Sequence, residues 1–104
     1  LVFTSANGVR IFFERLRAIG FDLRRLHPVQ LAAIGPQTAR ALEALGLCVD
    51  VLPGEFRAEG LVEEFRRRGM AGQRVLLPRA AGAREVLPRE LIAMGAVVDE
   101  IPTY

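Results

Sequence analysis

Short apolar runs alternate with helix-patterned stretches along the whole 104-residue sequence. The apolar runs fall at residues 1–3, 31–34, 47–52, 74–78 and 96–101, and apolar side chains at helical spacing mark the stretches between them. Strands that alternate with helices in this way form a parallel sheet through right-handed crossovers, with helices on both faces. The alternation therefore predicts a five-stranded α/β domain over residues 1–104, and it favours the flavodoxin-like strand order 2-1-3-4-5.

The clearest local signal is a strand, tight turn and helix within residues 29–46. The second apolar run stops at Gly35-Pro36, and a helical stripe follows until Gly46. Proline suits the first helical position, and glycine suits the position just past the end. The turn would present the free N–H groups of Gln37 and Thr38 to an anion. A Gly-Pro turn can equally do no more than join two packed elements, and both interpretations stay open at this point.

Similar stop signals place the other helices. A helix is expected from about 58 to 68, with Gly69 as its end, and Pro88 fits only the first turn of the last helix. His27 lies beside a proline and is expected to be a loop residue. The single cysteine, Cys48, lies in the third apolar run, which predicts a buried and unreactive thiol.

Composition excludes several classes of function. All fourteen basic residues are arginine, so this chain cannot form a lysine Schiff base, and a net charge of +2 is too small to argue for nucleic acid. One histidine and one cysteine cannot make a metal cluster. The chain is 51% hydrophobic, yet no run is long enough to span a membrane. It starts inside a strand without methionine, so a piece of a longer protein is expected. No signal peptide is visible, although a truncated start does not allow that to be judged, and a cytoplasmic monomer is the default expectation.

The carboxyl ends of parallel strands meet at one edge of a sheet, where ligands of such folds bind. This edge is expected to carry hydroxyls, turn amides and one arginine, and its candidate residues are Thr4, Ser5, Asn7, Gly35, Gln37, Thr38, Arg79 and Tyr104. No glycine-rich nucleotide loop follows any strand. These groups favour an acidic partner. A phenol stays protonated at neutral pH, so the only tyrosine, Tyr104, can donate a proton or simply pack at a strand end.

Taken together, the segments resemble the uroporphyrinogen-III synthase (HemD) family. The resemblance rests on LVFTSANGV at the start, AAIGPQTARAL at 32–42, GLCVDVLP at 46–53, AEGL at 58–61, RVLLPR at 74–79, REVL at 84–87 and GAVVDEIPTY at the end. Each motif alone is common, whereas the ordered set covers the chain and is specific. It implies the second of two flavodoxin-like domains, with the first domain absent from this chain.

The resemblance also implies a function. Enzymes of this family are cyclising hydro-lyases that close the linear tetrapyrrole hydroxymethylbilane and invert its ring D, without a cofactor, in haem, sirohaem and cobalamin biosynthesis. Tyr104 matches the family tyrosine proposed to help the terminal hydroxyl leave. Thr4 and Ser5 match a turn that faces the interdomain cleft, with 35–38 and Arg79 as further substrate-binding candidates. Since the substrate lies between the domains, this domain alone is expected to be inactive.

A non-catalytic module remains the alternative. A receiver domain would need acidic residues after its first strand, where Thr4 and Ser5 stand instead. A flavin carrier would need flanking aromatic residues, which are missing. A ligand-sensing module derived from the synthase could keep the fold and lose the chemistry, and the presence of Tyr104 is the feature that speaks against it.

Overall fold

The computed structural model describes residues 1–104 as alternating strands and helices. In chain order the elements are β1 (Val2–Phe3), α1 (Ala6–Ala18), a short 3₁₀ helix η1 (Leu23–Leu26), β2 (Ala32–Ala33), α2 (Pro36–Glu43), α3 (Ala58–Arg68), β3 (Arg74–Arg79), α4 (Val86–Ala93) and β4 (Val97–Pro102). The alternation predicted from the sequence is confirmed. The third apolar run is the exception, because only Val51 pairs with a strand there.

Local sequence signals explain the helix bounds. Proline occupies the start of α2, and α3 spans the predicted residues and ends at Gly69, whose φ of 80° is easy only for glycine. Pro88 lies in the first turn of α4, where its missing N–H costs no hydrogen bond. The sequence did not predict η1, which is capped by the Asp22 side chain.

The strands form two parallel pairs, β1 with β2 and β3 with β4, rather than one hydrogen-bonded sheet of five strands. β1 and β2 contribute two residues each, because the helix caps Ser5 and Gly35 follow almost at once. A parallel bridge joins Ala32 to Val51. β1 lies beside β3 without a backbone ladder between them.

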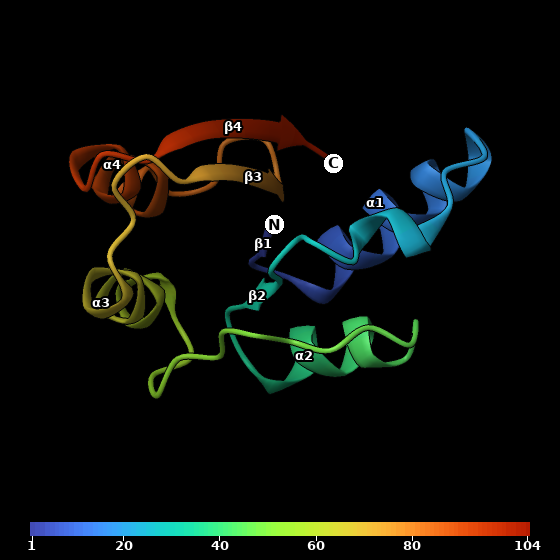
Figure 1. The fold of residues 1–104 in the computed structure, drawn as a ribbon, viewed down its shortest axis with the longest axis horizontal. Coiled ribbons are helices and arrows are strands. Elements are labelled where there is room, and N and C mark those ends of the chain that lie inside the picture. Colours follow the sequence, from blue (N-terminus) through green and yellow to red (C-terminus); the bar gives the residue numbers. More distant parts are fainter.

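The expected strand order 2-1-3-4-5 is wrong. Across the fold the order is the Val51 segment, β2, β1, β3 and β4 (Figure 1). The reason lies in the handedness of the crossovers. Two successive right-handed crossovers that leave their helices on one face must step in the same direction along the sheet. Because α1 and α2 share a face, the third segment lands beyond β2 and not beside β1.

Two hydrophobic clusters lie on opposite sides of the strands. One joins α1 and α2 to Phe3 and Ala33, and the other joins α3 and α4 to Val2 and Ala32. Neighbouring residues of β1 and β2 thus point to opposite faces, as strand geometry requires. In Figure 1 the two helix pairs flank the strands, which makes three layers. None of the helices is long and apolar enough to cross a membrane.

The prediction of a buried Cys48 is wrong, because its side chain is exposed. The segment alternates: Val51 points inward and is buried, while Cys48 and Asp50 point outward. The Asp50 carboxylate accepts a hydrogen bond from the backbone N–H of Leu31 at 2.7 Å. This contact fixes the register that turns the thiol to solvent.

Candidate functional site

The two ends of the chain meet at the carboxyl edge of the strands. The hydroxyl oxygens of Ser5 and Tyr104 are 2.8 Å apart, a hydrogen-bond distance between residues 99 positions apart in sequence. Ser5 is the N-cap of α1, and its Oγ accepts the backbone N–H of Gly8 at 2.9 Å. That bond leaves the serine proton free to point at the phenol oxygen. Two of the sequence-predicted candidates therefore form one hydroxyl pair.

Backbone bonds to the loop after β3 hold Tyr104 in place. The N–H of Ala81 donates to the carbonyl of Tyr104 at 2.9 Å, and the N–H of Thr103 donates to the carbonyl of Arg79 at 2.9 Å. The tyrosine side chain itself is 52% exposed. Its hydroxyl is thus held by the Ser5 bond and is still open to a bound molecule.

Most of the remaining candidates line one open hollow of about 490 Å³ beside this pair. Its lining comes from the junction of β1 with α1, the junction of β2 with α2 and one loop residue, Phe56. The sequence-predicted members are Thr4, Ser5, Asn7, Gly35, Gln37 and Thr38. The structure therefore brings together six candidates, with Tyr104 bonded to one of them.

The N-terminus of α2 lines the hollow. Gly35 is the N-cap and has no side chain to accept the first N–H groups of the helix. Those of Gln37 and Thr38 have no intrahelical partner by geometry, and the helix dipole adds positive potential there. The hollow thus combines hydroxyls with N–H donors, which can bind carboxylates and supply a proton, and it holds no strong nucleophile.

Arg79 is not brought to this hollow. Its buried guanidinium is tied down by Glu100, with Nε 2.8 Å from Oε1, and by the backbone carbonyl of Arg84. The pair joins β3 to the edge strand β4. Arg79 therefore helps to hold the segment after β4 that ends in Tyr104: its side chain binds Glu100 on β4, and its backbone carbonyl accepts the N–H of Thr103.

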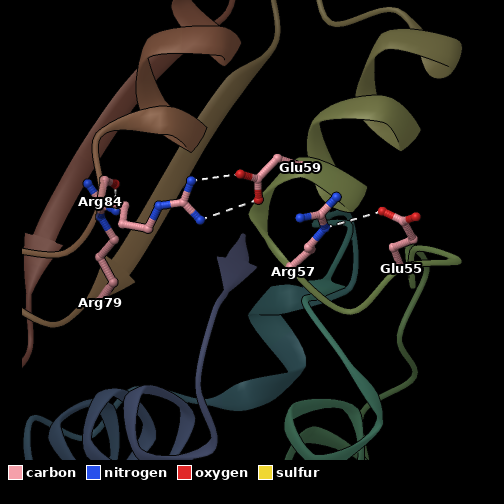
Figure 2. A network of polar contacts seen from close by, with 5 residues as sticks. All are labelled: Glu55, Arg57, Glu59, Arg79 and Arg84. Carbon is pink, nitrogen blue, oxygen red and sulfur yellow. Dashed lines mark hydrogen bonds and ion pairs between the residues drawn. The ribbon is translucent and has the colours of Figure 1, made fainter.

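Sequence reasoning missed a second group of charges, shown in Figure 2. Arg84 binds Glu59, with one nitrogen 2.6 Å and the other 3.3 Å from the two carboxylate oxygens, and Arg57 binds Glu55 at 3.2 Å. The sequence offered one signal for the first pair: an acidic residue, Glu59, lies at the start of α3, and a basic residue, Arg84, lies in the loop before α4. The Glu59–Arg84 bridge ties the start of α3 to the loop before α4.

Acid should weaken this bridge in a defined pH range. Hydrogen bonds from Arg84 lower the pKa of Glu59 from 4.5 to about 2. A lowered carboxyl pKa adds stability above pH 4.5, and that stability is lost as the pH falls toward 2. We expect Glu59→Gln to lower the melting temperature slightly at pH 7 and not at pH 2, since both side chains are solvent-exposed. Arg84→Gln should do the same, and an equal loss at both pH values would contradict the assignment.

Metal chemistry has no support at this edge. No three histidine, cysteine, aspartate or glutamate side chains are grouped to hold a metal ion. The exposed His27 follows η1 and lines a different hollow, together with Cys48 and Asp50.

Comparisons with known proteins show the family of the chain. A family model described as uroporphyrinogen-III synthase HemD matches residues 1–104. A uroporphyrinogen-III synthase of Synechococcus elongatus is 41% identical over 105 residues, covering 100% of this chain and 39% of the relative. The porphyrin biosynthesis protein HemD of Ruminiclostridium josui is 33% identical and covers 100% of this chain and 21% of its own length.

A solved structure shares the fold. The crystal structure of uroporphyrinogen III synthase from the extremely thermophilic bacterium Thermus thermophilus matches with a TM-score of 0.81 at 27% identity, over 99% of this chain and 39% of that one. The chain thus spans about two fifths or less of the relatives it matches. A match along every residue, with the fold of a solved member, shows that this chain belongs to the uroporphyrinogen-III synthase HemD family.

Proposed function

We propose that the full-length protein containing this chain converts hydroxymethylbilane to uroporphyrinogen III, with inversion of ring D. The observation that carries the proposal is the Ser5–Tyr104 hydroxyl pair at the carboxyl edge, next to a hollow rich in N–H donors. The relatives named as synthases support the reaction class. No cofactor is needed for the steps below.

Tyr104 is the proposed proton donor. As the family mechanism is usually drawn, the terminal hydroxyl of the substrate leaves first and an azafulvene remains. A proton from the phenol lets that hydroxyl leave as water, and loss of the pyrrole N–H proton to the phenolate then gives the neutral azafulvene and restores the phenol. Ser5 Oγ accepts a hydrogen bond from the Gly8 N–H and lies 2.8 Å from the phenol oxygen. In this proposal the serine hydroxyl donates to the phenol oxygen, so that the phenol proton faces the substrate. The serine also stabilises negative charge that develops on the phenol oxygen.

The later steps need positioning more than acid or base strength. The substituted carbon of ring D attacks to give a spiro intermediate, which fragments and closes again with the ring inverted. A substrate with eight carboxylates requires many donors in fixed positions. In this proposal Thr4, Asn7 and the amides of Gln37 and Thr38 hold carboxylates, Gly35 leaves these amides uncovered, and Arg79 acts by holding the loop that fixes Tyr104.

The chain is proposed to be the second domain of its protein, with the substrate bound between it and the first domain. The hollow described above is open on one side and would be one wall of that cleft. A bound tetrapyrrole contacts both walls, so neither wall alone makes a complete site.

The product isomer tests the proposed function. Hydroxymethylbilane generated enzymatically is mixed with the full-length protein, and the products are oxidised and separated into I and III isomers by chromatography. Spontaneous closure gives the I isomer, so an excess of the III isomer is expected. Formation of the I isomer alone would reject the synthase and favour the ligand-sensing module.

A further inference from the structure

Phe56 is a mostly exposed apolar side chain in the loop between α2 and α3. Of the six phenylalanines it is the only exposed one, with 58% of its surface accessible. Exposed single apolar residues are common on proteins. This one, however, is the only aromatic residue that lines the hollow beside the hydroxyl pair.

Gly35 provides the surface on which Phe56 rests. The φ of Gly35 is −162°, an extended conformation that any residue adopts, so the backbone does not require glycine here. Space does. A Cβ at this position would lie 3.1 Å from the Cβ of Phe56 and 3.5 Å from its Cγ. The absence of a side chain at Gly35 lets Phe56 sit directly over the start of α2.

A second glycine anchors the turn that carries the ring. Gly60 is buried in the first turn of α3, and a Cβ there would lie 1.9 Å from the carbonyl oxygen of Glu55. The carbonyl therefore packs on the bare helix backbone, and it also accepts the N–H of Arg57 at 2.9 Å. The backbone of Phe56 is thus held between Glu55 and Arg57, the two residues joined by this hydrogen bond.

We propose that Phe56 is an aromatic platform that stacks on one pyrrole ring of the bound tetrapyrrole. This inference rests on the proposed function and assigns a tetrapyrrole-binding residue to it. A pyrrole ring is flat and apolar, while its substituents end in carboxylates. The side chain of Phe56 can stack on the pyrrole ring. The N–H groups at the start of α2, next to Gly35, can then donate hydrogen bonds to one of the carboxylates of that pyrrole.

The platform should affect binding more than chemistry. An aromatic stack is made with substrate, intermediate and product alike, so its loss weakens all of them together. Phe56→Ala is expected to raise KM for hydroxymethylbilane and Kd for uroporphyrinogen III about tenfold, with little change in kcat. Phe56→Tyr keeps the ring and should bind like the wild type.

The test is anaerobic calorimetric titration of the full-length protein with uroporphyrinogen III. Ile92→Ala is the matched control, because Ile92 is 59% exposed on α4 and does not line the hollow. Melting temperatures of all variants verify folding. Weaker binding by Phe56→Ala, with wild-type binding by Phe56→Tyr and Ile92→Ala, would support the platform.

Equal affinity of Phe56→Ala and the wild type would overturn the platform, as would a wild type that does not bind this tetrapyrrole. The proposed function is judged separately by the product isomer. If the III isomer forms and Phe56→Ala binds normally, the function stands and the platform falls. If Phe56-dependent binding is seen without the III isomer, the platform stands and the synthase reaction falls.

Discussion

The isolated 104-residue chain is expected to form uroporphyrinogen III at least about 1000-fold more slowly than the full-length protein. The reason is geometric. Enzymes gain much of their rate by holding the reacting atoms in place, and one open wall cannot hold a four-ring substrate. The assay is III-isomer formation from hydroxymethylbilane by both proteins at equal concentration.

Folding has to be verified before that loss is interpreted. The two hydrophobic clusters contain eleven and six buried residues, so the isolated chain is expected to show a cooperative melting transition. A folded chain without activity supports the two-wall cleft. Turnover of the isolated chain at the full-length rate would show that this domain holds the complete site.

Replacing Tyr104 by phenylalanine is expected to slow III-isomer formation by about 100- to 10,000-fold in the full-length protein, the range typical of a general acid. The variant keeps the ring and removes only the hydroxyl, which bonds Ser5 at 2.8 Å. kcat should fall more than KM rises, because the proton is needed only as the hydroxyl leaves.

Two controls keep this result interpretable. The melting temperature should change little, since the tyrosine side chain is half-exposed and its backbone bonds to the 79–81 loop remain. The spontaneous rate of I-isomer formation is measured without protein and subtracted. A Tyr104→Phe enzyme as fast as the wild type would remove the phenol from the mechanism.

Much of the fold follows from local sequence signals. Pro36 and Gly69 mark real helix ends because each acts through its own backbone geometry. The strand order does not follow in this way. It depends on which face α2 packs against, and that is decided by long-range burial. Cys48 was misplaced for a related reason, because only the pairing of Asp50 with Leu31 sets which side chains of the segment point outward.

The candidate site, too, can be predicted only in part from the sequence. Sequence position indicates that Thr4, Ser5 and Gly35 lie at the carboxyl edge, since the ends of parallel strands share an edge. The Ser5–Tyr104 bond joins opposite ends of the chain, so no local pattern indicates it. Arg79 is a similar case: its partner Glu100 lies on the neighbouring strand, and only the β3–β4 register brings the charges together.

The central claim is that Ser5 and Tyr104 act as one proton-donating unit, and a double-mutant cycle tests it most directly. Ser5→Ala, Tyr104→Phe and the double variant of the full-length protein are compared for the rate of III-isomer formation. Ser5→Ala also removes a helix cap, so rates are measured well below the melting temperature of each variant. We predict that Ser5→Ala slows the wild type and has little further effect on Tyr104→Phe. Independent effects that multiply in the double variant would contradict the claim.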